Sequence, residues 1–145
     1  MEQQITFLKS VDENPILMRY FEGRVPAGFP SAAEDYMEEQ IDFNTYLKPR
    51  PSSTFVIRVT GDSMIGACIP DKALLIIDKS IKPKNNHTVL AVVNGEFTVK
   101  WFIENSSGIT LMPANKKYKP IPIREGMNFY VWGTVTKVIF DPVKS

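Results

Sequence analysis

The pair Asn94-Gly95 constrains the fold most strongly, because it separates two runs that are typical of β-strands. Residues 88–93 and 96–103 are rich in β-branched and aromatic side chains. Asn and Gly both accept a positive φ, so this pair closes a two-residue turn between antiparallel strands. The sequence therefore predicts a β-hairpin over residues 88–103.

Further runs of the same kind predict a mainly β protein. The expected strands cover residues 54–59, 73–77, 108–112, 121–123 and 128–140. Eleven prolines and eight glycines in 145 residues favour many short elements joined by turns over a helical bundle. A hydrophobic content of 43% suits one compact domain of this length, which we place at residues 31–145.

One helix is expected at the start of this domain. Ser31 and Glu34 fit the capping-box pattern, in which each side chain satisfies a free backbone donor of the other residue. Apolar residues then follow at approximately helical spacing, and acidic residues in the first turns suit the helix dipole. The helix should end before Pro49, because proline restricts the residue that precedes it.

Residues 1–30 are expected to form a flexible N-terminal arm, because their apolar residues show no sustained period. Near its end, Pro26 and Pro30 bracket the Ala27-Gly28 bond. Proline favours an extended backbone in the preceding residue and lacks an N–H for a helix. An extended segment of small residues suits the cleft of a protease. A plain linker is the alternative interpretation.

The charge pattern limits the partners. Seventeen basic and sixteen acidic side chains give a net charge of +1, which argues against a dedicated nucleic-acid binder. Residues 1–71 carry 6 basic and 11 acidic side chains (−5), whereas residues 72–145 carry 11 and 5 (+6). This asymmetry allows docking within the chain, between two chains, or onto a charged partner.

Cysteine count and hydropathy predict the compartment. Cys68 is the single cysteine, so no internal disulfide can form. The longest apolar runs have five residues, whereas a membrane span needs about 20. No signal-peptide pattern opens the chain. We therefore expect a cytoplasmic protein with no membrane association.

A Cys68–His87 pair is the first candidate for chemistry, as a nucleophile with its base. His87 follows a polar stretch that predicts a loop, and Cys68 lies between Ala67 and Ile69, which indicates packing. A structural role is therefore favoured for both. One His and one Cys are too few for a metal site, and no phosphate-binding glycine loop is present, so neither metal nor cofactor is expected.

Ser63 is the second candidate, in Gly61-Asp62-Ser63-Met64 directly after the strand predicted from residue 54. A serine at a sharp turn after a strand can expose its hydroxyl while backbone N–H groups of Asp62 and Ser63 point into the same space. That arrangement supplies a nucleophile and an oxyanion hole. Asp and Ser also favour ordinary turns and helix N-caps, and that alternative stays open.

Lys100 is the third candidate. It lies beside Val99 and Trp101, and desolvation disfavours the charged form of a lysine and lowers its pKa. An uncharged amine can accept a proton from serine as a general base. The alternative is a lysine on the solvent face of the hairpin, because Glu96, Thr98 and Lys100 share one face of their strand.

Together and in this order, these signals resemble the LexA/UmuD family of self-cleaving serine–lysine peptidases, from about residue 25 to the C-terminus. The matching stretches are Ala27-Gly28-Phe29-Pro30-Ser31 with Asp35-Tyr36, then Gly61-Asp62-Ser63-Met64, then Asp78, and Asn94-Gly95-Glu96-Phe97-Thr98-Val99-Lys100. The resemblance implies a curved antiparallel peptidase domain in which Ser63 is the nucleophile and Lys100 the general base. It also implies that Ala27-Gly28 is the scissile bond.

The resemblance further implies a role in SOS mutagenesis. In this family a RecA filament on single-stranded DNA stimulates cleavage, and the shortened homodimer joins a Y-family polymerase of the UmuC type. Only about 27 residues precede the expected cleavage site, too few for the DNA-reading domain of a LexA-type repressor, so sequence-specific DNA binding is not expected. A LexA-type regulator and a non-catalytic dimeric binding module are the alternatives.

Overall fold

A computed structural model of the chain describes residues 4–8, 14–22 and 37–142. The chain forms two compact units, one made of residues 1–10 and 50–145 and the other of residues 11–49. The boundary expected at residue 30 lies outside the described residues, so it stays a prediction. Each unit is described by itself below.

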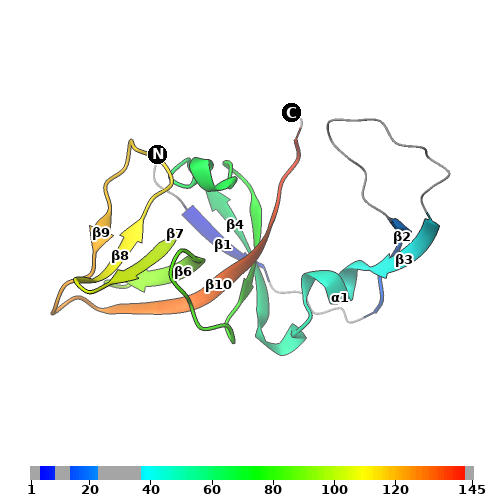
Figure 1. The fold of residues 1–145 in the computed structure, drawn as a ribbon, viewed down its shortest axis with the longest axis horizontal. Coiled ribbons are helices and arrows are strands. Elements are labelled where there is room, and N and C mark those ends of the chain that lie inside the picture. The colour runs from blue at the N-terminus through cyan, green and yellow to red at the C-terminus, as the bar shows by residue number, and fades with distance from the viewer. Residues whose placement is uncertain (1–3, 9–13, 23–36, 143–145) are drawn as a thin grey trace. The chain divides into compact units, whose positions relative to one another are not determined.

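The larger unit is built on one antiparallel sheet of eight strands (Figure 1). Its strands are β1 (Gln4–Leu8), β4 (Thr54–Thr60), β5 (Leu74–Asp78), β6 (Thr88–Val93), β7 (Glu96–Asn105), β8 (Gly108–Met112), β9 (Ile121–Pro122) and β10 (Phe129–Ile139). Two short 3-10 helices, η2 (Pro51–Ser53) and η3 (Ile65–Ala67), flank β4. The prediction of a mainly β, antiparallel protein is confirmed, and the expected strands from residue 54 onward are present with ends shifted by at most two residues.

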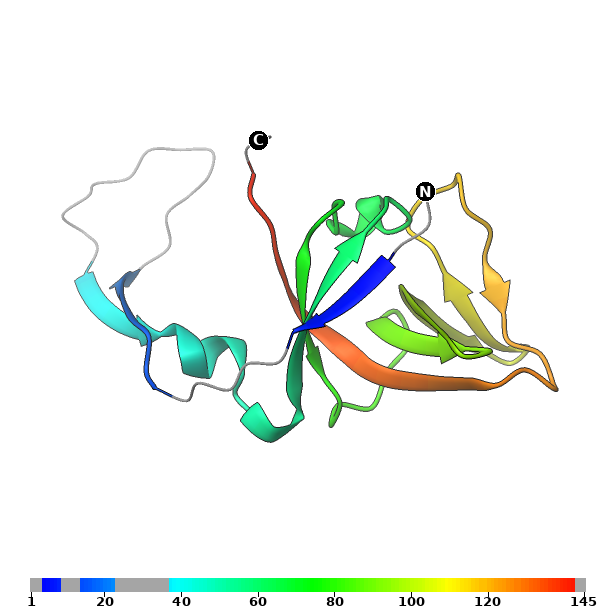
Figure 2. The ribbon, with the colours of Figure 1, turned by 180° about the vertical axis from the view of Figure 1, so that it is seen from behind.

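The last strand, β10, lies inside the sheet and not at its edge. The strand order is β1-β4-β5-β10-β6-β7-β8-β9, so β10 joins β5 to β6. Figure 1 and, from behind, Figure 2 show β10 (orange to red) running from one group of strands to the other. Its register shifts between Val131 and Gly133 and again between Val135 and Lys137. Such bulges bend a strand and increase its twist.

Gly133 shows why the sequence needs a glycine at the first of these bulges. A Cβ built on this residue would collide with the Cγ2 of Ile77 on the neighbouring strand β5. The same Cβ would lie 3.3 Å from the Asp78 carbonyl oxygen, so any other residue would require the buried Ile77 side chain or the strand itself to shift. Close approach of a neighbouring strand is a common reason for a glycine within a strand.

Two groups of buried apolar side chains hold the sheet together. The larger group includes Ile57 and Val59 of β4, Leu75 and Ile77 of β5, and Val99 of β7. The smaller group contains Val89, Ala91, Phe102 and Leu111, from β6, β7 and β8. Because both groups draw on several strands, burial of apolar surface supplies the main stabilisation of this unit.

The hairpin predicted from Asn94-Gly95 is confirmed. Val93 pairs with Glu96, and the φ angles of Asn94 and Gly95 are 50° and 84°. Two positive φ angles in succession define the turn that matches the right-handed twist of the flanking strands.

The smaller unit shows that the predicted helix is wrong over part of its length. It contains the hairpin β2 (Leu17–Glu22) and β3 (Met37–Asp42), followed by the five-residue helix α1 (Phe43–Leu47). Asp42 caps α1 by accepting a hydrogen bond from the Asn44 N–H at 2.9 Å, so the helix begins after residue 42. Residues 37–42 form a strand because β2 supplies hydrogen-bond partners that local spacing cannot reveal. The capping box at Ser31 lies outside the described residues.

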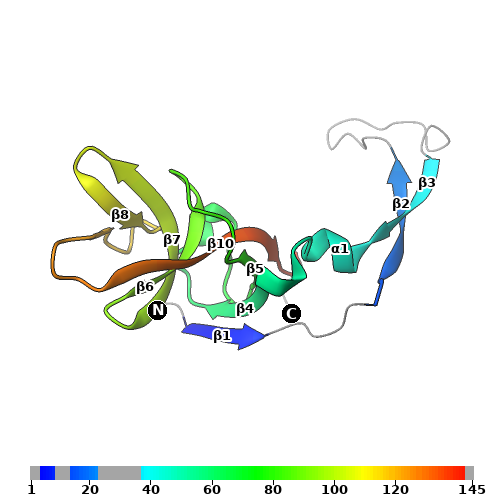
Figure 3. The same ribbon diagram turned by 90° about the horizontal axis from the view of Figure 1, so that it is seen from below.

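Parts of the predicted N-terminal arm also form strands. β1 pairs with β4, with Ile5 opposite Val59, and Figure 3 shows the two strands side by side. β2 pairs with β3 in the smaller unit. In the described part of the chain, no helix is long and apolar enough to cross a membrane.

Asp78, at the end of β5, is a buried carboxylate with several donors around it. It accepts hydrogen bonds from the Ser80 N–H and hydroxyl, from Ser53 Oγ at 2.9 Å, and from Arg50 Nε at 2.6 Å. Burial raises the pKa of the Asp78 carboxyl, but the hydrogen bonds from Ser80, Ser53 and Arg50 outweigh burial and lower it to about 2. The network ties η2 to the end of β5.

The free energy of unfolding is expected to depend on pH through Asp78. Because the folded pKa lies below the unfolded one, this contribution is complete above pH ~4 and is lost as the pH falls towards 2. The loss amounts to about 2 kcal/mol. Urea unfolding of the wild type and of Asp78→Asn at pH values of about 5 and 2.5 measures it, since the asparagine does not titrate. A stability difference between the two proteins that is equal at both pH values would contradict the prediction.

Candidate active site

Ser63 lies in a tight turn that follows β4. Gly61 adopts a φ of 103°, which favours glycine, and its N–H donates to Asp71 Oδ1 at 2.7 Å. The Ile65 N–H donates to the Asp62 carbonyl at 3.3 Å, which reverses the chain into η3. The Ser63 side chain is thereby turned inward and is fully buried.

Lys100 lies on β7, paired with Val89 of β6, and is only 2% exposed. Its Nζ lies 3.4 Å from Ser63 Oγ, 2.7 Å from Thr98 Oγ1 and 3.1 Å from the Val99 carbonyl oxygen. The alternative of a lysine on the solvent face is therefore wrong. Thr98 and Lys100 do share one face of the strand, as expected, but the Lys100 side chain is buried there.

The Lys100 amine is buried, and burial disfavours the charged form of a lysine. An uncharged Nζ next to a serine hydroxyl can accept its proton. The arrangement can therefore activate Ser63 as a nucleophile.

The backbone near Ser63 offers a donor for a developing negative charge. Among the residues that the structure describes, the Ser63 N–H donates no hydrogen bond to any other group. Backbone N–H groups of this kind form the oxyanion holes of acyl-transfer enzymes. Asp62, the other predicted donor, directly precedes Ser63 in the same turn.

The loop at residues 113–120 holds Asp62. Asn115 Nδ2 donates to the Asp62 carbonyl at 2.9 Å, and the Tyr118 hydroxyl donates to Asp62 Oδ1 at 2.5 Å. The Tyr118 hydrogen bond is the largest influence on the pKa of Asp62, which is lowered, and Lys117 lowers it further. Sequence reasoning assigned no role to this loop, because its partner lies more than 50 residues away and nothing local marks the pairing.

A cavity of about 510 Å³ adjoins this loop. It is lined by Trp101, Met112, Pro113, Ala114, Asn115, Lys116, Tyr118 and Pro120. Two of these residues, Asn115 and Tyr118, are the ones that hydrogen-bond to Asp62. An apolar surface of this kind suits an extended peptide that carries small or aliphatic side chains.

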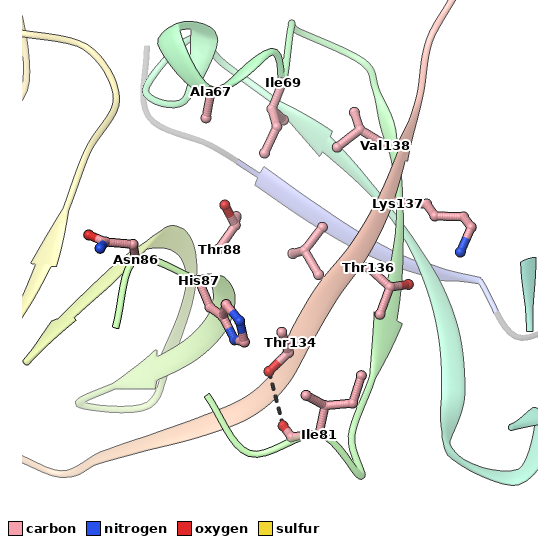
Figure 4. A pocket seen from close by; sticks show the side chains of 11 residues that line it. Ala67, Ile69, Ile81, Asn86, His87, Thr88, Thr134, Thr136, Lys137 and Val138 are labelled. Atoms are coloured by element: carbon pink, nitrogen blue, oxygen red, sulfur yellow. Dashed lines mark hydrogen bonds between the residues drawn. The ribbon is translucent and has the colours of Figure 1, made fainter. Parts of the chain in front are cut away.

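The structure gives no support to a Cys68–His87 pair. Cys68 is exposed, so the expectation that it is packed is wrong; a left-handed backbone with φ of 60° ends η3 at this residue. His87 Nδ1 accepts from the Lys84 N–H, as suits a loop, and in the described part of the chain it shares no hydrogen bond with Cys68. Figure 4 shows His87 at a second cavity, of about 530 Å³, to which Ala67 and Ile69 contribute but Cys68 does not.

Two further expectations concern the cleavage site and metal binding. Ala27 and Gly28, the expected cleavage site, lie outside the described residues. Among the described residues, no group of three or more His, Cys, Asp or Glu side chains could hold a metal ion.

Comparisons with known proteins identify the family of this chain. Residues 19–136 match the Peptidase S24-like family. The chain belongs to this family, and the predicted resemblance to LexA and UmuD is confirmed.

Three relatives illustrate the range of similarity. Protein SamA of Salmonella typhimurium is 40% identical over 82% of both chains. Protein ImpA of Escherichia coli is 37% identical over 82% of this chain and 81% of its own. The LexA repressor of Leptospira biflexa is 41% identical over 68% of this chain but only 48% of the repressor.

Proposed function

We propose that this protein is a self-cleaving serine peptidase of the SOS response, which cuts its own Ala27-Gly28 bond. The observation that carries the proposal is the 3.4 Å separation of Lys100 Nζ and Ser63 Oγ, both buried. In this proposal Ser63 is the nucleophile and Lys100 the general base. Family membership supports peptidase chemistry.

The first half of the reaction acylates Ser63. The uncharged Lys100 amine takes the Ser63 proton while Oγ bonds to the Ala27 carbonyl carbon. The carbonyl oxygen becomes negative and accepts hydrogen bonds from the backbone N–H groups of Asp62 and Ser63. The C–N bond then breaks, and the Lys100 ammonium returns its proton to the Gly28 amine. An ester between Ser63 and Ala27 remains.

Water completes the reaction. Lys100, uncharged again, accepts a proton from a water molecule, which attacks the ester carbonyl. The ester breaks, Ser63 recovers its proton, and residues 1–27 leave with a new carboxylate at Ala27. Because substrate and enzyme are one chain, the reacting bond is present at a high effective concentration and each molecule reacts once. The protein thus works as a switch.

The segment around the scissile bond is proposed to bind as an extended strand, either in its own subunit or in the other subunit of a homodimer. Val25 supplies an apolar anchor, and Ala27 and Gly28 allow close approach to Ser63. The cavity beside Trp101 and Ala114 supports this mode, because two of its lining residues bond to the turn that holds Ser63.

The cellular role is proposed to be that of an SOS mutagenesis accessory protein in the cytoplasm. Its similarity to SamA and ImpA along about four-fifths of the chain supports this role over that of a repressor. A RecA filament on single-stranded DNA would favour the docked form of the arm, which is otherwise a minor population. The shortened homodimer would then serve a Y-family polymerase of the UmuC type in copying damaged DNA.

Mixing the protein with RecA, single-stranded DNA and a nucleoside triphosphate is expected to release residues 1–27. Intact-mass measurement should show a new species that begins at Gly28, because the filament stabilises the docked arm. The same mixture without single-stranded DNA should react far more slowly. An unchanged mass under activating conditions would contradict self-cleavage and favour a binding module that acts through its dimer surface alone.

A further inference from the structure

We infer that Asn115 and Tyr118 are positioning residues, which orient the peptide between Asp62 and Ser63 so that the Ser63 N–H faces the reacting carbonyl. The inference rests on the proposed function, since it concerns the oxyanion hole of that reaction. Both residues act through Asp62, to which each donates a hydrogen bond.

Because a peptide bond is planar, the direction of its carbonyl also determines the direction of its N–H. The Asp62 carbonyl and the Ser63 N–H belong to one peptide unit and point in opposite directions when the unit is trans. The structure contains no cis peptide among its described residues. The 2.9 Å bond from Asn115 Nδ2 to the Asp62 oxygen, which is shorter than the 3.3 Å bond that the same oxygen accepts from the Ile65 N–H, therefore also helps to fix the direction of the Ser63 N–H.

Tyr118 provides a second attachment to the same residue. Its hydroxyl donates to the Asp62 carboxylate at 2.5 Å, and hydrogen bonds to a charged acceptor are about twice as strong as neutral ones. Lys117 also approaches this carboxylate, at 3.6 Å, but its side chain is 66% exposed. An exposed ion pair contributes little, so Tyr118 is the main anchor.

The loop at residues 113–120 forms hydrogen bonds to the chain on both sides of Ser63. Ahead of Ser63 it bonds to Asp62; beyond Ser63 the Ala114 N–H donates to Met64 Sδ at 3.3 Å, and the Ala114 carbonyl accepts from the Gly66 N–H at 2.8 Å. Gly66 leaves no space for a Cβ against that carbonyl. With both flanks held, the turn cannot rotate about Ser63 without breaking several of these bonds.

Asn115→Asp tests the inference with the smallest change of shape. Asn115 Oδ1 accepts from the Lys117 N–H at 3.0 Å, and an aspartate keeps this turn while it removes the donor to Asp62. Asn105→Asp is the matched control, because Asn105 Oδ1 accepts from the Ser107 N–H at 2.9 Å in an exposed turn. RecA-independent self-cleavage should slow about 10- to 100-fold in Asn115→Asp and change less than about twofold in Asn105→Asp.

Two further readouts separate positioning from a general structural role. Reaction of Ser63 with a small phosphonyl fluoride needs the oxyanion hole but no docking of the arm, so it should slow by the same factor as self-cleavage. The midpoint of the pH–rate profile should not move in Tyr118→Phe, because this change adds no charge near Lys100. Normal phosphonylation with slow self-cleavage would overturn the inference, as would a displaced midpoint in Tyr118→Phe or a wild-type rate in Asn115→Asp.

Tyr118→Phe keeps the inference testable if Asn115→Asp fails to fold, since it removes one hydroxyl from a partly exposed side chain. Both the self-cleavage and the phosphonylation rates should fall about 3- to 10-fold, and unchanged rates would overturn the inference. A wild-type protein that neither cleaves itself nor reacts with the phosphonyl fluoride would instead refute the proposed function, whatever the variants do.

Discussion

Ser63→Ala is expected to abolish release of residues 1–27, with a fall in rate of more than about 10³-fold. The variant lacks the oxygen that must bond to the Ala27 carbonyl carbon. Ser63 is fully buried and its hydroxyl contacts Lys100, so removal of one oxygen should leave the fold intact. Intact-mass measurement follows the cleavage, and circular dichroism and thermal unfolding follow the fold.

Ser52→Ala is the matched control, because Ser52 lies exposed in η2 and makes no contact with the dyad. It should cleave like the wild type. Release of residues 1–27 by a folded Ser63→Ala protein would remove Ser63 from the mechanism. A comparable loss of cleavage in Ser52→Ala would show that the assay reports stability instead.

Raising the pH is expected to accelerate self-cleavage in the absence of RecA. The reaction needs the uncharged form of Lys100, and below the titration of that amine its population grows about tenfold for each pH unit. The rate should therefore rise with pH from neutral and level off when the amine is fully uncharged. Initial rates measured by mass across this range give the profile.

Lys100→Met tests whether Lys100 is the group that causes the pH dependence of self-cleavage. Methionine keeps most of the apolar stem in its buried site but cannot accept a proton, so the cleavage and its pH dependence should both disappear. Lys82→Met, at an exposed lysine, should retain the wild-type profile. A wild-type rate that stays flat from neutral to alkaline pH would reject Lys100 as the base.

The sequence predicted the elements whose signals are local. The Asn94-Gly95 turn needs two positive φ angles, and few residue pairs supply them, so the hairpin could be placed to the residue. Strands such as β6 and β8 were equally clear, because their β-branched runs end at polar turns. These features depend on residues only a few positions apart.

Elements that depend on distant partners could not be predicted in the same way. The spacing of residues 37–42 indicated a helix, but pairing with β2 makes them a strand. β1 is a strand because β4 lies beside it, more than 40 residues later in the chain. No local pattern records such pairings.

The candidate site also combines local features with features that depend on the tertiary fold. Ser63 and Lys100 were each compatible with an ordinary structural role when taken alone, and their assignment as candidates came from the resemblance of the combined motifs to the LexA/UmuD family. Their burial and the 3.4 Å distance between Lys100 Nζ and Ser63 Oγ depend on the tertiary structure, so they could not be predicted from local sequence. Asn115 was missed because an asparagine in a polar loop is ordinary until its acceptor, the Asp62 carbonyl, is known.

The place of β10 bears on when the protein can first act during its synthesis. Ser63 follows β4 and Lys100 lies on β7, and the ladder that links these two groups of strands runs through β10. A ribosome makes β10 last among the strands, so a nascent chain lacks the piece that completes the sheet around the dyad. If Ser63 and Lys100 act as proposed, an unfinished chain would be unable to cut itself, because the sheet that brings the two residues together is completed only when residues 129–139 have been made.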